Sequence, residues 1–206
     1  MILDKALDGH SHNTPDSTFR HRFFVHSDTT DRPLLFLDVD GVISIFGFQE
    51  GFGLAAGDAS FDDRPPGALH NVNGVLHYIS SGCAGHLERL GERFELVWAS
   101  GWEETANDYL PHLLGLPAAL PYLSFDGRVR AGSAHWKIEA IDEYAGARPL
   151  AWIDDNVDDS CKRWARARQA PTLIIETVRH EGMREEHVEL LLTWAEEVVG
   201  GPRRAA

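Results

Sequence analysis

The sequence predicts an α/β fold, a three-layer sandwich in which helices cover both faces of a mostly parallel central sheet. Short continuous apolar runs recur along the chain, as is typical of strands buried on both faces. Amphipathic segments of helical length separate these runs, as the crossover connections of a parallel sheet require. The 206 residues, 43% of them hydrophobic, are enough for one substantial core. We therefore expect one folded domain over residues 33–202.

Residues 1–32 differ in composition from the rest of the chain. They are rich in His, Ser, Thr and Asp, and they carry little periodic apolar pattern beyond residues 23–25. Such a composition favours an N-terminal extension that is partly disordered. His10 and His12 are of a metal-binding type, but the sequence offers no obvious third ligand. A solvated His-rich arm is the interpretation we favour.

The first predicted strand covers residues 34–37, a buried apolar run that opens into a loop at Asp38. Residues 45–74 hold six glycines, and two adjacent prolines fall within the same stretch, so we expect a loop or a small hairpin there. Helical periodicity returns at residues 84–90. A second buried strand follows at residues 94–99 and ends at Ser100.

The alternation of helix and strand continues to the C-terminus. The expected elements are a helix at 103–114, a short strand at 123–125, a helix at 135–144, a strand at 149–153, a helix at 158–169 and a strand at 172–175. A last helix should end at Gly200. Its predicted apolar face consists of Met183, His187, Leu190, Leu191, Trp194 and Val198.

Charge and cysteine content exclude several classes of protein. Acidic residues outnumber basic ones by 32 to 19, for a net charge of −13, which disfavours loose binding to nucleic acid or to anionic membranes. Cys83 and Cys161 lack the spacing of a disulfide framework or a zinc site. The sequence has no apparent signal peptide or transmembrane stretch, so we expect a cytoplasmic protein without a membrane partner.

Polar residues follow three of the predicted strands. Because the carboxyl ends of strands in an open α/β sheet meet at one edge, these residues should converge. They are Asp38 and Asp40 after the first strand, Ser100 after the second, and Asp154 and Asp155 after the third. Lys137 lies near the start of the helix before the third strand and can join them.

Four carboxylates packed together repel one another, and a hard divalent cation such as Mg²⁺ relieves that repulsion. With the metal bound, one carboxylate remains free to act as a nucleophile. A lysine and a serine hydroxyl beside it would hold the oxygens of a phosphoryl group. This set of residues indicates phosphoryl transfer through an aspartyl-phosphate intermediate.

The same residues stand in motifs that resemble those of the haloacid dehalogenase (HAD) superfamily of phosphatases. Residues 35–42 (LFLDVDGV) resemble its first motif, residues 97–100 (VWAS) its second, Lys137 its third and residues 152–155 (WIDD) its fourth. More narrowly, residues 95–102 and 152–155 look like the compact HAD domain of Swiss Army Knife RNA repair proteins. The resemblance implies a HAD-like hydrolase domain, a Rossmann-like sandwich that is capless or carries a minimal flap.

The resemblance also implies a role for each residue. Asp38 would be the nucleophile, and Asp40 would protonate the leaving oxygen, later activate water, and offer its main-chain carbonyl to Mg²⁺. Ser100 and Lys137 would bind the phosphoryl oxygens. The metal site would consist of Asp38, Asp40, Asp154 and Asp155, the last acting directly or through water. Dehalogenase members lack the aspartate that stands at position 40, so the sequence favours a phosphatase.

An open, capless site suits a phosphorylated macromolecule, and a nucleic-acid end is one candidate substrate. Trp102, just past the second strand, is the tryptophan for which base stacking is worth testing. A basic track could come from Arg128, Arg130, Arg163, Arg166 and Arg168, although solvated surface charge is the interpretation we favour. The alternative function is a catalytically weak module that binds a phosphate or a nucleic-acid end. The sequence leaves the oligomeric state open.

Overall fold

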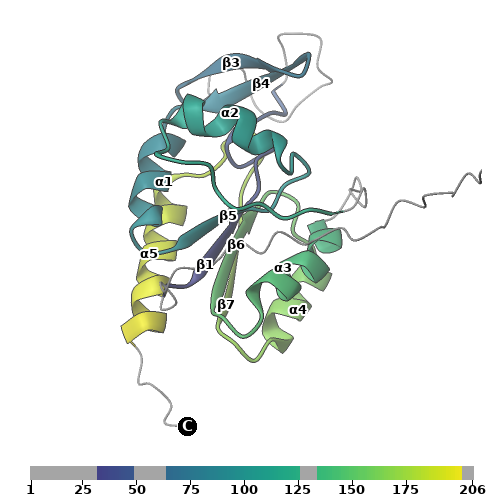
Figure 1. The fold of residues 1–206 in the computed structure, drawn as a ribbon, viewed down its shortest axis with the longest axis vertical. Coiled ribbons are helices and arrows are strands. Elements are labelled where there is room, and N and C mark those ends of the chain that lie inside the picture. The colour runs from purple at the N-terminus through teal and green to yellow at the C-terminus, as the bar shows by residue number, and fades with distance from the viewer. Residues whose placement is uncertain (1–31, 49–63, 126–133, 201–206) are drawn as a thin grey trace, which may run out of the picture. The chain divides into compact units, whose positions relative to one another are not determined.

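The computed structural model describes residues 32–48, 64–125 and 134–200. Its larger sheet is parallel and has the strand order β5-β1-β6-β7 (Figure 1). These strands are β1 (Leu34–Leu37), β5 (Glu95–Trp98), β6 (Leu150–Asp154) and β7 (Thr172–Glu176). The predicted N-terminal extension, with His10 and His12, lies outside the described residues apart from Arg32.

The two central strands, β1 and β6, are buried along their whole length. Side chains of a strand alternate between its faces, so β1 contributes to two separate cores. Leu35 and Leu37 join one hydrophobic cluster, whereas Leu34 and Phe36 join the other. A strand with a core on each side must be apolar throughout, which explains the continuous run at residues 34–37.

Helices cover both faces of the parallel sheet (Figure 1). The first core contains buried residues of α1 (Cys83–Gly91), α2 (Thr105–Leu114) and α5 (Glu185–Gly200). The second contains residues of α3 (Ile138–Ala145) and α4 (Asp159–Ala167). The predicted three-layer α/β sandwich around a mostly parallel sheet is therefore confirmed.

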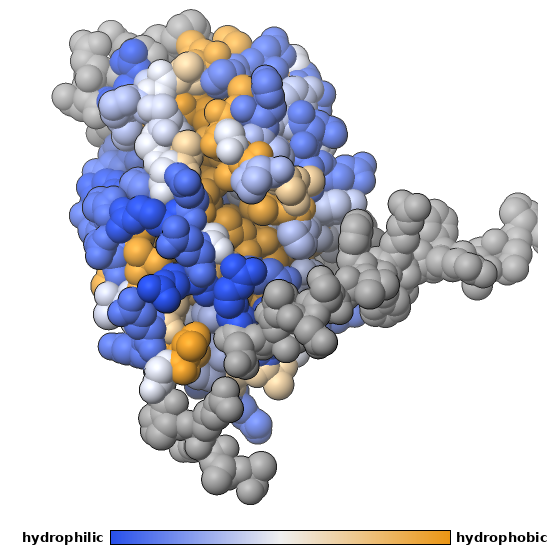
Figure 2. Space-filling view, turned by 60° about the vertical axis from the view of Figure 1, so that its left-hand side comes forward, coloured by the Kyte–Doolittle hydropathy of each residue, from blue (hydrophilic) through white to orange (hydrophobic). Residues whose placement is uncertain are grey.

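The outer surface of α1 and α5 is charged. Arg89 on α1 forms ion pairs with Glu185 and Glu189 on α5, which joins the two helices across their solvent side. Figure 2 brings this side of the molecule forward and shows hydrophilic residues beside a hydrophobic stripe. Within the described ranges, no helix has both the length and the apolar character needed to cross a membrane.

A smaller antiparallel sheet lies in the stretch between β1 and α1. Its strand order is β2-β4-β3, with β2 at Ser44–Ile45, β3 at Gly67–Val72 and β4 at Val75–Ser80. Asn73 and Gly74, with φ angles of 51° and 87°, form the tight turn between β3 and β4. Positive φ at both central residues is what a two-residue hairpin of this type needs. The predicted hairpin is present, but its pairing extends to Ser80, beyond the predicted limit at residue 74.

Two sequence predictions are wrong in detail. Residues 123–125 do not form a strand, because the pairing is limited to an isolated bridge between Tyr122 and Trp98. The Phe125 N–H donates to the Glu103 carboxylate. The last helix begins at Glu185, so Met183 precedes it, and Leu190 is 56% exposed instead of facing the core. The buried positions of this helix are Val188, Leu191 and Ala195.

Candidate active site and carboxylate cluster

The predicted site residues converge because β1 pairs with both of its neighbours in parallel. Leu37 lies opposite Trp98 of β5 and opposite Ile153 of β6, so the residues that follow these three positions are adjacent. The Asp38 N–H donates to the Ile153 carbonyl over 3.1 Å, which extends the pairing to the first catalytic candidate. Parallel pairing thus brings Asp38 and Asp154 together.

Lys137 lies between the carboxylates of Asp38 and Asp154. It ends a short 3-10 helix, η2 (Ala134–Lys137), and it is only 3% exposed. Its Nζ is 2.8 Å from Asp38 Oδ2 and 2.6 Å from Asp154 Oδ2. Burial alone would lower the pKa of Lys137, but the two carboxylates outweigh it and raise that pKa. The buried lysine is therefore held in its charged form.

Three carboxylates form the tightest group of candidate metal ligands. Oxygen atoms of Asp38, Asp154 and Asp155 all lie within 4.8 Å of one another. Burial, together with the charges of Asp38 and Asp154, raises the pKa of Asp155 to about 7. Burial and the Asp38 charge likewise raise the pKa of Asp154. The single positive charge of Lys137 does not compensate three carboxylates. Their oxygen atoms are the kind of ligand that a hard divalent cation prefers, so the group fits such a cation.

The loops after β1 and β6 approach each other closely at Gly41. Its φ is +75°, and a Cβ atom placed there would lie 2.3 Å from Asp155 Cγ. The Gly41 carbonyl accepts a hydrogen bond of 2.8 Å from the buried Thr177 hydroxyl, just after β7. Both the positive φ and the missing side chain are needed for Asp155 to reach the carboxylate group.

Asp40 stands beside this group, and its side chain is 46% exposed. Its Oδ2 accepts a hydrogen bond of 3.0 Å from Trp102 Nε1, and its Oδ1 is 3.6 Å from His77 Nδ1. Partial burial raises the pKa of Asp40, an effect that the Trp102 hydrogen bond opposes and the Asp38 charge reinforces. The carboxyl group is thus both reachable and fixed in orientation.

Ser100 is buried at the end of β5, and its Oγ accepts a long hydrogen bond of 3.5 Å from the Trp102 N–H. The sequence predicts that the helix after Ser100 starts at residue 103. The helix instead starts at Thr105, with Glu104 as its N-cap. Ser100 therefore does not cap α2. The N-cap of α4 is Asp158, whose side chain accepts hydrogen bonds from two backbone N–H groups.

The sequence did not identify His77, Thr177 or Arg179 as neighbours of the site. Arg179 is exposed just after β7, and its charge lowers the pKa of Asp155 against the larger effects that raise it. No local pattern marks these residues, because they approach the motif residues only through the pairing of strands far apart in the chain.

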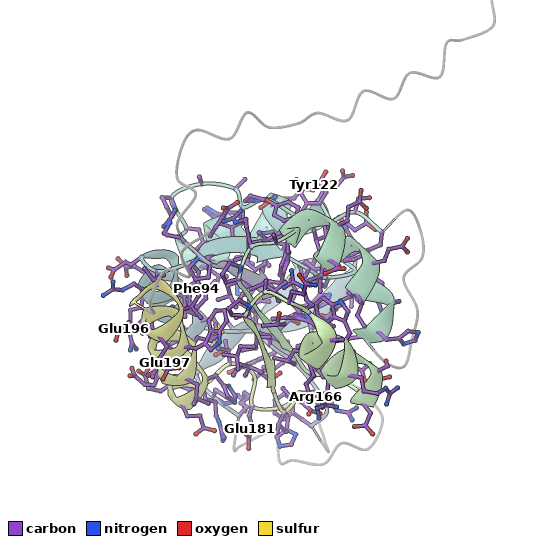
Figure 3. All side chains as sticks on the ribbon, turned by 90° about the horizontal axis from the view of Figure 1, so that it is seen from below. Phe94, Tyr122, Arg166, Glu181, Glu196 and Glu197 are labelled. Carbon is purple, nitrogen blue, oxygen red and sulfur yellow. The ribbon has the colours of Figure 1, made fainter. Side chains whose placement is uncertain are left out.

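A basic track beside the site does not appear among the described residues named for it. Arg168 pairs with Asp142 and with the Gly146 carbonyl, at the end of the sheet opposite the carboxylates. Figure 3 shows Arg166 on the outer side of α4, and Arg163 is likewise exposed on that helix. Arg128 and Arg130 lie outside the described residues. Solvated surface charge remains the better interpretation of the described arginines.

Comparison with known proteins places the chain in a family. No curated protein matches it. Residues 34–188, however, match the family described as the HAD domain in Swiss Army Knife RNA repair proteins. The matched range runs from β1 into α5 and includes all six predicted site residues. The chain therefore belongs to this family of HAD domains.

Proposed function

We propose that this chain is a Mg²⁺-dependent phosphomonoester hydrolase that forms an aspartyl-phosphate on Asp38. The observation that carries the proposal is the buried contact of Lys137 with Asp38 and Asp154, beside a third carboxylate on Asp155. Membership of a HAD domain family supports a hydrolase at the superfamily level. The arrangement supplies a nucleophile, a buried cation and a set of metal ligands at one edge of the sheet.

The metal ligands in this proposal are the carboxylates of Asp38, Asp154 and Asp155 and the main-chain carbonyl of Asp40. Hard oxygen donors of this kind suit Mg²⁺. When bound, Mg²⁺ neutralises charge on the phosphoryl oxygens and on the attacking carboxylate.

In the first step, an Asp38 oxygen attacks phosphorus and the bond from phosphorus to the leaving oxygen breaks. Asp40, protonated at the start, gives its proton to the leaving oxygen. Lys137 and Ser100 hold the phosphoryl oxygens and balance the charge that they carry. The products of this step are a free alcohol and the phosphorylated side chain of Asp38.

In the second step, Asp40 has become a carboxylate and takes a proton from water. The water oxygen attacks phosphorus, and the bond between phosphorus and Asp38 breaks. Inorganic phosphate leaves, Asp38 is again a free carboxylate, and Asp40 again holds a proton. One group therefore serves as acid and then as base, which a raised pKa suits.

We propose a phosphate at the end of a nucleic acid as the substrate class. The family description refers to RNA repair proteins, which supports this choice. In the stretch from β1 to α1, the described residues form a small sheet without a helical cap, and Asp40 remains 46% exposed beside it. An open site of this kind can accept a terminal phosphate on a large molecule.

The test is hydrolysis of p-nitrophenyl phosphate and of terminally phosphorylated oligonucleotides by the purified 206-residue chain with Mg²⁺. Asp38→Asn should abolish turnover, since the nucleophile is lost, and chelation of the metal should do the same. Asp142→Asn, which changes an exposed carboxylate on α3, is the matched control and should keep activity. Undiminished hydrolysis by Asp38→Asn would overturn the mechanism. Equal rates on small sugar phosphates would overturn the substrate class.

A further inference from the structure

The carboxyl group of Asp40 is contacted by side chains from two other elements. Trp102, in the loop between β5 and α2, donates its indole N–H to Asp40 Oδ2 over 3.0 Å. His77, on β4 of the small sheet, places Nδ1 at 3.6 Å from Asp40 Oδ1. Trp102 therefore forms a hydrogen bond with one oxygen of this carboxyl group, and His77 lies close to the other.

His77 and Trp102 are themselves held in place. The Ser44 hydroxyl and His77 Nδ1 are 2.9 Å apart and share a hydrogen bond. The rings of His77 and Trp102 meet edge to face, with centroids 4.6 Å apart and planes at 70°. The side chain of His77 is only 17% exposed. Ser44, His77 and Trp102 thus form a connected support around Asp40.

This support limits how the Asp40 carboxyl group can rotate. An indole N–H can only donate a hydrogen bond and has no proton to exchange near neutral pH. Trp102 therefore cannot replace Asp40 as an acid, and its contact acts on the direction of the carboxyl group. General acid catalysis requires the proton to lie within hydrogen-bond reach of the leaving oxygen, so this direction matters for the rate.

The contacts also bear on the expectation that Trp102 stacks on a base of the substrate. The indole N–H is already used by Asp40, and His77 packs against the ring. The geometry therefore gives Trp102 a role in fixing Asp40 that does not depend on stacking. The small sheet also contributes to the site, because His77 lies on its strand β4.

We propose that Trp102 and His77 are positioning residues that hold the Asp40 carboxyl group in line with the leaving oxygen. The inference rests on the proposed phosphatase function and names two residues that serve it. It predicts an effect specific to proton donation, because a nitrophenolate leaves without help from an acid whereas an alkoxide does not.

The test measures kcat/KM of Trp102→Phe and His77→Phe on phosphate monoesters whose leaving groups range from nitrophenols to simple alcohols. This parameter covers the steps up to loss of the leaving group and excludes the later hydrolysis of the aspartyl-phosphate. We expect a loss of about 10- to 100-fold for alkyl esters and of less than about 3-fold for p-nitrophenyl phosphate. Asp40→Asn should give the same pattern with a larger loss.

Two matched controls change the same residue types elsewhere. Trp164→Phe alters a half-buried tryptophan on α4, and His70→Phe alters the residue directly opposite His77 on β3. Both should leave kcat/KM unchanged over the whole ester series. If Trp102→Phe fails to fold, His77→Phe carries the test, since it keeps an aromatic ring against Trp102.

The outcomes separate this inference from the proposed function. A wild-type protein without Asp38-dependent turnover overturns the phosphatase proposal and the positioning role together. If wild-type turnover depends on Asp38 but the two variants lose activity equally on all esters, the residues act only on structure. Unchanged activity in both variants also overturns the positioning role while leaving the phosphatase proposal intact.

Discussion

Lys137 is only 3% exposed, and it contacts two carboxylates. Removing one partner of a buried ion pair leaves the other charge uncompensated, which is costly in a poorly solvated place. Without the Lys137 ammonium group, the carboxylates of Asp38 and Asp154 would both be buried without a compensating charge. The stability of the metal-free protein therefore depends on this single side chain.

Lys137→Met should lower the free energy of unfolding by about 3 kcal/mol in the presence of chelator. Mg²⁺ should restore part of that loss, because a cation that binds the folded state stabilises it. Urea denaturation with and without Mg²⁺ measures both effects. Lys162→Met, which removes an exposed lysine paired with Glu176, is the control and should leave the denaturation midpoint unchanged. A Lys137→Met protein as stable as wild type in chelator would contradict this prediction.

The site residues differ in how far the sequence can reveal them. Asp38 and Ser100 follow apolar strands and Asp154 ends one, so the topology of a parallel sheet is enough to bring them together. No sequence pattern places His77 at the site, because its position beside Asp40 depends on the pairing of β2 with β4 in a separate sheet. Sequence periodicity does not specify which distant strands will pair. Trp102 follows β5, which pairs with β1, so the topology places it near Asp40 but does not specify the hydrogen bond between their side chains.

At the scale of elements, the loops after β1 and β6 form the proposed metal site by packing against each other. Gly41 has a φ of +75° and leaves no room for a Cβ atom beside Asp155. Gly74, in the turn between β3 and β4, also has a positive φ, of +87°, but nothing lies within 4 Å of its missing Cβ. An alanine at Gly74 would cost only backbone strain, whereas an alanine at Gly41 would add a steric clash with Asp155. Comparing the two variants therefore separates the two costs.

Gly41→Ala should reduce turnover strongly, because Asp155 must move away from the other carboxylates. It should also destabilise the fold by about 3 kcal/mol, from strain at positive φ plus the close contact. Gly74→Ala should cost about 1 kcal/mol from strain alone and keep kcat/KM at the wild-type value. Thermal denaturation and p-nitrophenyl phosphate hydrolysis provide the two readouts. Equal activity of the two variants would show that the approach of Gly41 to Asp155 has no bearing on the site.

The elements that the sequence predicts best are those buried on both sides. The short continuous apolar runs of β1 and β6 favour a central strand that is buried on both faces. The hairpin of β3 and β4 was only partly predicted, because most of β3 is exposed and Leu69, Val75 and Leu76 face solvent. Its main sequence signal is the turn at Asn73 and Gly74. A half-exposed hairpin beside a buried sheet has too weak a hydrophobic pattern to fix its limits.

At the scale of the whole molecule, the net charge of −13 opposes the approach of a polyanion. The proposed site works against this background with Lys137, the exposed Arg179 and bound Mg²⁺ as local positive charges. Such an arrangement accepts one terminal phosphate while the rest of a nucleic acid is repelled. The dependence of the reaction on salt should reveal which of the two influences dominates.

For a terminally phosphorylated oligonucleotide, kcat/KM should rise as ionic strength increases from roughly 20 to 150 mM. Salt in this range shortens the screening length to about 8 Å, which weakens long-range repulsion more than contacts within the site. A small phosphate ester carries little extra charge, so its kcat/KM should change much less, and it serves as the control. A protein that bound nucleic acid along a basic track would show the opposite trend, with affinity falling steeply because the release of counterions on binding is less favourable at higher salt. A steep fall for the oligonucleotide alone would therefore contradict recognition of the terminal phosphate only, and would point to an extended contact with the chain.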